Sequence, residues 1–149
     1  MRKRDESGSA LVELVWLGIL LLVPILWIVV TVFDVQKGAF AVNGAARAAG
    51  RAYALAPDDA TGRARAEAAA RQAFADHGVD EPVEVRITCS PYPHDCHSGT
   101  SVITVRIASR VDVPLVPDFL GGDAPSIALD ATHTVPIGQF QEVAGAAQD

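Results

Sequence analysis

The sequence lacks the short motifs by which several common enzyme classes are recognised. It contains no G-x-S-x-G nucleophile elbow, no H-E-x-x-H zinc motif and no glycine-rich phosphate-binding loop. Its pair of adjacent glycines, Gly121-Gly122, lies in a proline-rich stretch that is typical of a turn. None of the four histidines belongs to a catalytic motif: His77, His94, His97 and His133. We therefore predict a protein that is not an enzyme and that needs no cofactor.

Charged residues are also missing from Leu14 to Phe33, a run of 20 residues near the start of the chain. A helix of that length spans about 30 Å, which is the thickness of the hydrocarbon core of a bilayer. Helices of soluble domains rarely stay apolar on every side for so long. We therefore predict a transmembrane helix over residues 9–33, in contact with membrane lipid.

A cleaved secretory signal is the alternative interpretation of this run. Ala39-Phe40-Ala41 loosely fits the A-x-A pattern of a signal-peptidase site. That tripeptide lies beyond the charged Asp34 and Lys37, however. The run is also longer than the roughly 7–15 apolar residues of a signal peptide. The sequence therefore favours a membrane anchor.

Basic residues are scarce after the apolar run, and this sets the predicted orientation. Residues 1–8 hold three of them, whereas Asp34 and then a lone Lys37 follow the run. By the positive-inside rule, residues 1–8 are a cytoplasmic leader and residues 34–149 lie outside. Residues 34–149 have 9 Lys and Arg against 15 Asp and Glu, and so carry the whole net charge of −6. This balance argues against nucleic acid or anionic lipid as a partner of the outer part.

Residues 34–57 are predicted to continue the helix outside the membrane. No proline interrupts them before Pro57, and alanine, a strong helix former, is their commonest residue. Small residues recur on one side at helical spacing, which would let a second helix approach closely. These candidate packing residues are Ala41, Ala45, Ala48, Ala49 and Ala52. The alternative is that alanine serves here only as a helix former.

A second helix and three strands are predicted beyond this point. Asp58 and Asp59 offer an N-cap for a helix over residues 60–77, and Gly78 ends it. Apolar and polar residues then alternate as in half-buried strands. The predicted strands cover residues 83–89, 101–115 and 127–135.

Two residues are expected to disturb these elements. Pro24, in the apolar run, removes one backbone donor and predicts a bend in the long helix. Ser109 interrupts the apolar positions of the second strand and predicts a bend or a bulge.

The order of two helices followed by three strands predicts an α+β fold, with an antiparallel sheet packed against a helix. We expect one small extracytoplasmic domain, residues 58–137, that covers the outer half of the long helix. Residues 138–149 show no periodic pattern and are predicted to be a flexible tail.

Cys89 and Cys96 are the only cysteines, and they flank a short turn after the first predicted strand. In an extracytoplasmic domain the simplest interpretation is a disulfide, which would contribute about 2–3 kcal/mol by closing a short loop. A zinc site formed with His94 and His97 is the alternative, because these residue types are zinc ligands. Two prolines in the intervening loop make tetrahedral closure awkward. Free thiols are the third possibility.

Glu13 lies at the mouth of the apolar run. A carboxylate at that place is costly unless it reaches water or meets a cation. Glu13 therefore either extends toward the headgroups or has a positively charged partner.

Gly8, followed by Glu13 and a long apolar helix, resembles the processing motif of type IV pilins and pseudopilins. The basic leader is similar too, with Arg2-Lys3-Arg4. The stretch from Asp5 to Glu13 resembles most closely the TadE-like proteins of Tad (Flp-type) pilus systems. Pro24 in mid-membrane and an alanine- and arginine-rich run after it fit that family, so the resemblance covers about residues 4 to 53.

The resemblance implies a function and its residues. In the family a prepilin peptidase cuts after the glycine, which here would be between Gly8 and Ser9, and would make Glu13 the fifth mature residue. In pilins this glutamate pairs with the N-terminal amine of a neighbouring subunit during assembly. The expected protein is a non-enzymatic minor pilin or pseudopilin that meets other pilin subunits, the Tad assembly platform and the peptidase. The alternative is a membrane-anchored extracytoplasmic binding domain unrelated to pili.

Overall fold

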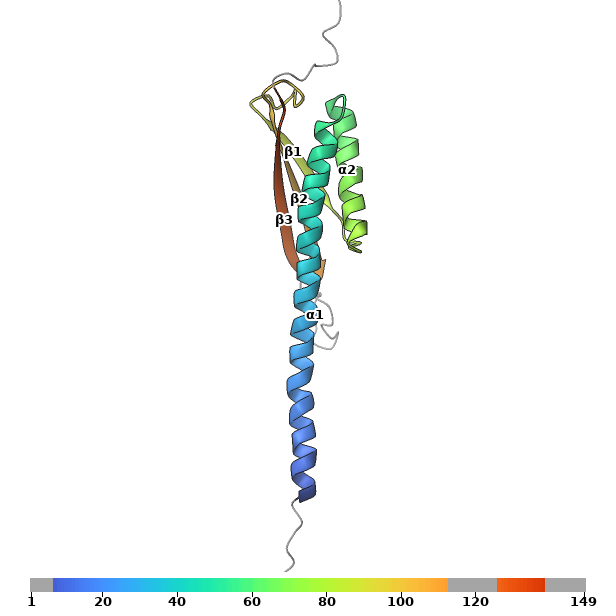
Figure 1. Cartoon of the computed structure of the whole chain (residues 1–149), viewed down its shortest axis with the longest axis vertical. Helices are drawn as coiled ribbons and strands as arrows, with labels where there is room; N and C mark the ends of the chain where they lie inside the picture. The colour runs from blue at the N-terminus through green and yellow to red at the C-terminus, as the bar shows by residue number, and fades with distance from the viewer. Residues whose placement is uncertain (1–6, 113–125, 139–149) are drawn as a thin grey trace, which may run out of the picture.

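Two helices precede three strands in the computed structural model, which describes residues 7–112 and 126–138 (Figure 1). The elements are α1 (Ser7–Ala54), α2 (Asp59–Asp76), β1 (Glu84–Ser90), β2 (Val102–Asp112) and β3 (Ser126–Pro136). The predicted α+β fold class is confirmed. The first six residues of the predicted leader, the last three positions of the second predicted strand and the predicted tail from residue 139 on lie outside the described residues.

Helix α1 is one continuous element of 48 residues, about 72 Å long at the standard rise. It includes Pro24, and Figure 1 shows α1 as one unbroken helix. A proline inside a helix removes one backbone hydrogen bond and crowds the carbonyl one turn earlier, yet α1 continues on both sides of Pro24. The bend expected at Pro24 stays a prediction. The predicted long helix is therefore present and ends three residues before Pro57.

Helix α2 begins and ends at the residues that the sequence marks for these roles. Asp58 is its N-cap, and the carboxylate accepts hydrogen bonds from the Thr61 backbone N–H at 2.9 Å and from the Thr61 hydroxyl at 2.8 Å. These bonds hold the pKa of the Asp58 carboxyl below its usual value. Gly78 follows the helix with φ of 60°, a left-handed conformation that glycine adopts without strain.

The three strands form an antiparallel sheet in the order β1-β2-β3. Val85 pairs with Ile107, and Ile107 pairs with Ala131, so apolar residues of all three strands share one face. The central strand contributes most to the core, because Ile103, Val105 and Ile107 are completely buried. The alternation predicted from the sequence is therefore the alternation between the packed and the solvent-facing sides of the sheet.

The bulge predicted at Ser109 is wrong. The pairing of β2 with β3 continues without interruption from Val102 to Asp112. Ser109 is buried on the packed face, and its hydroxyl donates a hydrogen bond to the Pro82 carbonyl at 3.1 Å. A serine fits this apolar row because its one donor is satisfied, so the strand has no need to bend.

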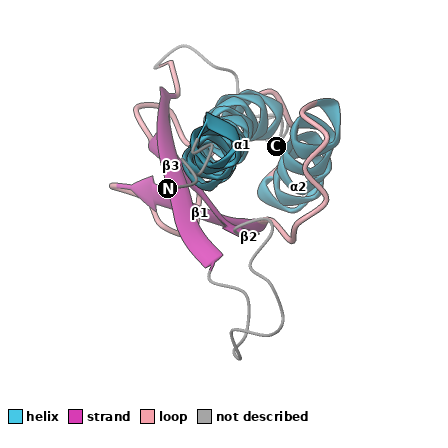
Figure 2. Ribbon diagram, turned by 90° about the horizontal axis from the view of Figure 1, so that it is seen from below, coloured by secondary structure: helices cyan, strands magenta, loops and turns pink. Residues whose placement is uncertain are grey.

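Helix α1 lies between the sheet and α2 (Figure 2). On the sheet side, a Cβ at Gly38 would lie 2.5 Å from Val111 and 2.7 Å from Leu129, and one at Gly50 would lie 3.1 Å from His133. On the other side, a Cβ at Gly44 would lie 3.5 Å from His77, which directly follows α2. Small residues therefore make this part of α1 thin enough to be packed from two sides.

Candidate functional site

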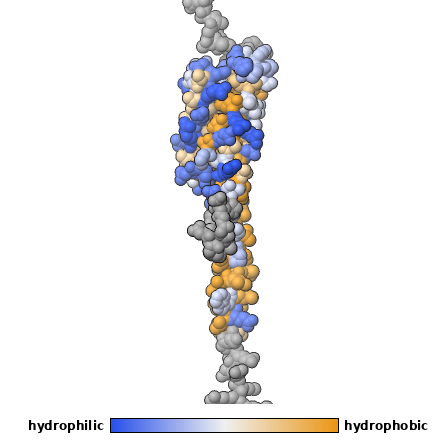
Figure 3. Space-filling model, turned by 180° about the vertical axis from the view of Figure 1, so that it is seen from behind, coloured by the Kyte–Doolittle hydropathy of each residue, from blue (hydrophilic) through white to orange (hydrophobic). Residues whose placement is uncertain are grey.

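The exposed length of α1 is the main candidate functional feature. Residues 10–29 are exposed on every side of the helix, and their large apolar side chains are between 37 % exposed, at Trp27, and 70 % exposed, at Leu20. Figure 3 shows apolar side chains gathered over this lower length and polar ones over the domain above it. We call residues 10–33 the anchor segment and residues 34–54 the domain segment. The helix is long and apolar enough to cross a membrane once.

The residues of the predicted processing site lie at the very start of α1. Gly8 and Ser9 belong to its first turn, and Glu13 follows in the next turns of the same helix. The Glu13 side chain is exposed, and within residues 7–112 and 126–138 the structure gives it no ion pair. Its carboxylate is therefore available to water, a headgroup or a cation from elsewhere.

The alanines predicted to pack against another helix are buried within the same chain. Ala41, Ala45 and Ala49 are completely buried, while Ala48 and Ala52 are partly buried. Gly44 lies on the side of Ala41 and Ala48 at helical spacing, and it is close to the end of α2. Helix α2 presents a small-residue row of its own, formed by Gly62, Ala66 and Ala70. The two rows meet in an intramolecular helix pair.

The remaining side of the domain segment is exposed. It carries Phe40, which is 67 % exposed, and the exposed Asn43, Arg47 and Arg51. Among the described residues neither arginine has an ion pair. Within residues 7–112 and 126–138, neither α2 nor the sheet covers this side of the domain segment.

Cys89 and Cys96 form a disulfide with a Cα–Cα distance of 5.3 Å. Both sulfurs are thereby used, so neither is available as a zinc ligand in this state. His94, the proposed third ligand, is exposed, whereas His97 is directed to other partners. The disulfide interpretation of the two cysteines is confirmed.

A cluster of Tyr53, Asp59 and His97 joins the disulfide loop to the two helices. His97 Nδ1 lies 2.6 Å from Asp59 Oδ1, and His97 Nε2 lies 3.1 Å from the Tyr53 carbonyl oxygen. The imidazole also stacks on the Tyr53 ring, with centroids 5.2 Å apart. The backbone N–H of Cys96 donates to Asp59 Oδ2 at 3.3 Å. One carboxylate thus binds two consecutive residues of the loop.

The buried position of this cluster shifts the pKa values of its acids. Burial opposes ionisation of Asp59, but the hydrogen bonds from His97 and from the Cys96 N–H outweigh it and hold the pKa of Asp59 below its usual value. Burial, together with the nearby charge of Asp59, raises the pKa of Tyr53 to about 12. The Tyr53 ring packs directly on α2, since a Cβ at Gly62 would lie 3.0 Å from it. Its hydroxyl is buried, and Asp59 is the acidic group that interacts with it.

His97 and Asp59 have the spacing of a catalytic dyad, but the second ring nitrogen of His97 is not free to contact a substrate. In a Ser-His-Asp triad the second ring nitrogen faces the nucleophile. Here that nitrogen faces the backbone carbonyl of Tyr53, and the ring is stacked on a buried side chain. The arrangement therefore fastens a loop, and it leaves no ring nitrogen for proton transfer to a substrate.

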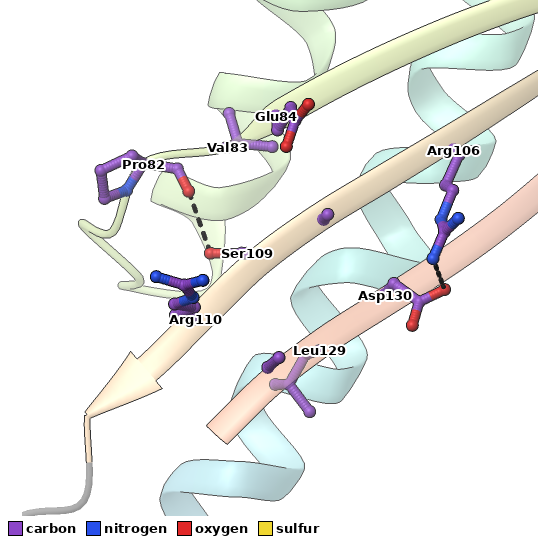
Figure 4. A pocket seen from close by; sticks show the side chains of 10 residues that line it. Pro82, Val83, Glu84, Arg106, Ser109, Arg110, Leu129 and Asp130 are labelled. Carbon is purple, nitrogen blue, oxygen red and sulfur yellow. Dashed lines mark hydrogen bonds and ion pairs between the residues drawn. The ribbon is translucent and has the colours of Figure 1, made fainter. Parts of the chain in front are cut away.

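A hollow of about 650 Å³ lies along the sheet, toward the end of the domain that faces the anchor segment (Figure 4). Small side chains, Ala108 and Ala128, line it beside the ion pair of Arg106 and Asp130, whose closest atoms are 3.3 Å apart. Both charged side chains are more than half exposed, so water screens their interaction. The lining of the hollow is more apolar than polar, and its exposed ion pair contributes little to stability.

The cluster around His97 was not predicted from the sequence, in which His97 was a candidate zinc ligand and Asp58 and Asp59 were candidates for a helix cap. A signal was present in the sequence, because one of two adjacent acids suffices as an N-cap and leaves the other free for a second partner.

No protein-family model, no curated protein and no solved structure matches the chain.

Proposed function

We propose that this chain is a TadE-like minor pilin or pseudopilin, a non-enzymatic structural or assembly component of a Tad-type pilus or a related secretion apparatus. The observation that carries the proposal is the division of one unbroken helix into a bare apolar segment and a segment packed inside a small α+β domain. A subunit that is held in a membrane before it joins its neighbours needs a lipid-embedded part and a water-exposed part on one continuous element.

The proposed orientation places the N-terminus in the cytoplasm and the domain outside the cell membrane. Three basic residues precede the anchor segment, and the excess of acids lies after it. The disulfide between Cys89 and Cys96 also suits an oxidising compartment.

Lateral contacts are proposed to run through the anchor segment. The alanine side of the domain segment is already covered by α2, and the sheet covers another side. In lipid, helices associate by close packing and by pairing of polar groups. Glu13 supplies such a group, and the N-terminal amine created by a cut between Gly8 and Ser9 in a neighbouring subunit is the cation proposed to pair with it.

The N-terminal sequence of the mature protein tests the processing step. In a strain that carries a prepilin peptidase, we expect the chain to begin at Ser9. Gly8→Ala should leave the leader in place, while the matched control Gly18→Ala should be processed like the wild type. A wild-type chain that still begins at Met1 in that strain would contradict the processing.

Glu13→Gln tests assembly separately. It should lower the amount of pilus platform that co-purifies with the full-length chain, because the neutral amide cannot form the proposed ion pair. Glu67→Gln, an equivalent change on the exposed side of α2, should have no such effect. If Glu13→Gln behaves like the control and no pilus component co-purifies, an anchored binding domain unrelated to pili becomes the better explanation.

A further inference from the structure

The distal end of the domain is fastened by a charged cluster whose chemistry depends on a proton. His97 contacts three separate parts of the chain: its own loop, the end of α1 through the Tyr53 carbonyl, and the start of α2 through Asp59. The side chain of His97 is 11 % exposed and that of Asp59 is 30 % exposed, so water only partly replaces these contacts.

Both partners of the imidazole are hydrogen-bond acceptors. A backbone carbonyl can only accept, and an ionised carboxylate can only accept. A neutral imidazole has one N–H and can donate to one of them, which leaves its other nitrogen lone pair facing an oxygen lone pair. The imidazolium donates to both. The observed arrangement therefore fits the protonated ring and is half satisfied by the neutral one.

The surrounding groups also suit a positive charge at this place. Tyr53 lies in the last turn of α1, where the helix dipole is negative, and Asp59 is the first residue of α2, where the dipole is positive. Asp58 lies close enough for the charge of His97 to contribute to its lowered pKa. Arg63 of α2 is a positive charge near the cluster, since it opposes the rise in the pKa of Tyr53. From the loop itself, Cys96 contributes a backbone N–H, and the exposed His94 and Asp95 precede it.

We propose that His97 is a pH-sensitive clasp that fastens the disulfide loop, residues 89–96, and the turn that follows it to the helix pair. With both ring nitrogens protonated, the clasp is closed. When the ring loses a proton, one of its two bonds is lost, and the loop is held by the Cys96 N–H and by the disulfide. The exposed side chains at the tip of the loop, Tyr92 among them, then become mobile relative to the helices. This inference does not depend on the proposed function.

The sign of the pH dependence follows from the two groups. The protonated ring donates to both acceptors and the neutral ring to only one, so protonation of the ring favours the closed clasp and deprotonation weakens it. Asp59 has a lowered pKa, so its contribution is present above the ordinary range of carboxyl groups and is lost only in stronger acid. The clasp is therefore closed in mild acid and opens toward alkaline pH.

Amide hydrogen exchange on the full chain in detergent micelles tests the proposal. The amides of Cys96, Ser98 and Ser101 are hydrogen-bonded within or next to the loop and report on it. After correction for intrinsic exchange, we expect their protection to fall by about tenfold between pH 5.5 and pH 8.5, the effect of losing one charge-assisted hydrogen bond. His97→Gln should have low protection at both pH values. His94→Gln, in the same loop and exposed, should keep the wild-type profile.

Two readouts separate the clasp from a general loss of structure. Exchange of the β2 amides should stay unchanged in every variant, which shows that the sheet is intact. The ¹⁵N resonances of His97 should report two protonated ring nitrogens at pH 5.5. A single protonated nitrogen at that pH, loop protection that does not change with pH, or a His97→Gln profile equal to that of the wild type would each overturn the proposal.

Discussion

The anchor segment and the domain segment are parts of one helix, yet they are built from opposite kinds of side chain. The anchor segment carries large apolar residues that are exposed on every side, such as Trp16 and Leu20. The domain segment carries small residues, with glycine at three of the points where neighbouring elements come close. The difference shows that side-chain size, more than helix propensity, determines which part of α1 other elements of the chain can pack against.

The physical reason is the solvent that each kind of side chain suits. In lipid an apolar side chain needs no protein cover, because hydrocarbon surrounds it on all sides. In water the same helix must lose its apolar surface to other elements. A thin helix can be covered by α2 on one side and by the sheet on another, as α1 is. The exposed side that remains carries Arg47 and Arg51, which water solvates.

The largest difference between the two regions is expected from cavity formation. Ile107→Ala should lower the free energy of unfolding of the domain by about 2–5 kcal/mol, because Ile107 is completely buried in β2. Ile25→Ala removes the same atoms from the anchor segment, where the side chain is 49 % exposed, and should leave the domain unchanged. Exchange of the β2 amides in the full chain in micelles measures both. An equal loss of protection in both variants would contradict the conclusion that Ile107 is packed in the domain core and Ile25 is not.

Removal of the disulfide should act on the domain alone. Replacing Cys89 and Cys96 by serine should destabilise the domain by about 2–3 kcal/mol, since the unfolded chain loses a closed loop. Trp16 and Trp27 both lie in the anchor segment, so their fluorescence should be the same with and without the disulfide. A change in that fluorescence would show that the two segments are coupled more closely than their packing suggests.

Overpacking gives a matched pair within α1 itself. Gly38→Val should destabilise the domain by about 1–3 kcal/mol, because its Cβ would lie 2.5 Å from Val111 and 2.7 Å from Leu129. Gly18→Val meets nothing within 4 Å and should have no effect on the domain. Thermal unfolding followed by near-UV circular dichroism distinguishes the two. Similar melting of both variants would mean that α1 does not lie tightly against the sheet.

The smallest effect is expected where the segments join. Lys37 donates a hydrogen bond to the Gly78 carbonyl at 2.6 Å and so ties the start of the domain segment to the end of α2. Lys37→Met keeps the aliphatic stem but loses the donor, and should cost about 0.5–1.5 kcal/mol. Gln36→Met, the exposed neighbour, serves as the control. Exchange at the last turn of α2 should rise in the first variant only.

Local patterns predicted most of the elements. The alternation that starts at Val83 and the cap at Asp58 act over a few residues, so the sequence contains the whole signal. Ser109 was misjudged because its partner, the Pro82 carbonyl, is 27 residues away in the chain. A serine in an apolar row predicts a bulge only if no acceptor is near, and periodicity carries no information on that.

Tertiary contacts explain what the sequence left open. The row of alanines predicts a close helix contact, but it does not say whether the partner helix belongs to the same chain. The cluster of Tyr53, Asp59 and His97 joins residues up to 44 positions apart, and its geometry depends on the disulfide next to it. The residues of the processing motif, Gly8 and Glu13, are recognised by their order alone and stay a prediction.

The most direct test of the account is the accessibility of single cysteines along α1 in intact cells. The native cysteines are joined to each other, so they give no background with a membrane-impermeant maleimide. Asn43→Cys, on the exposed side of the domain segment, should be labelled, while Leu21→Cys should be labelled only after the membrane is dissolved. Labelling of Leu21→Cys in intact cells, at a rate like that of Asn43→Cys, would contradict the division of the helix between lipid and domain.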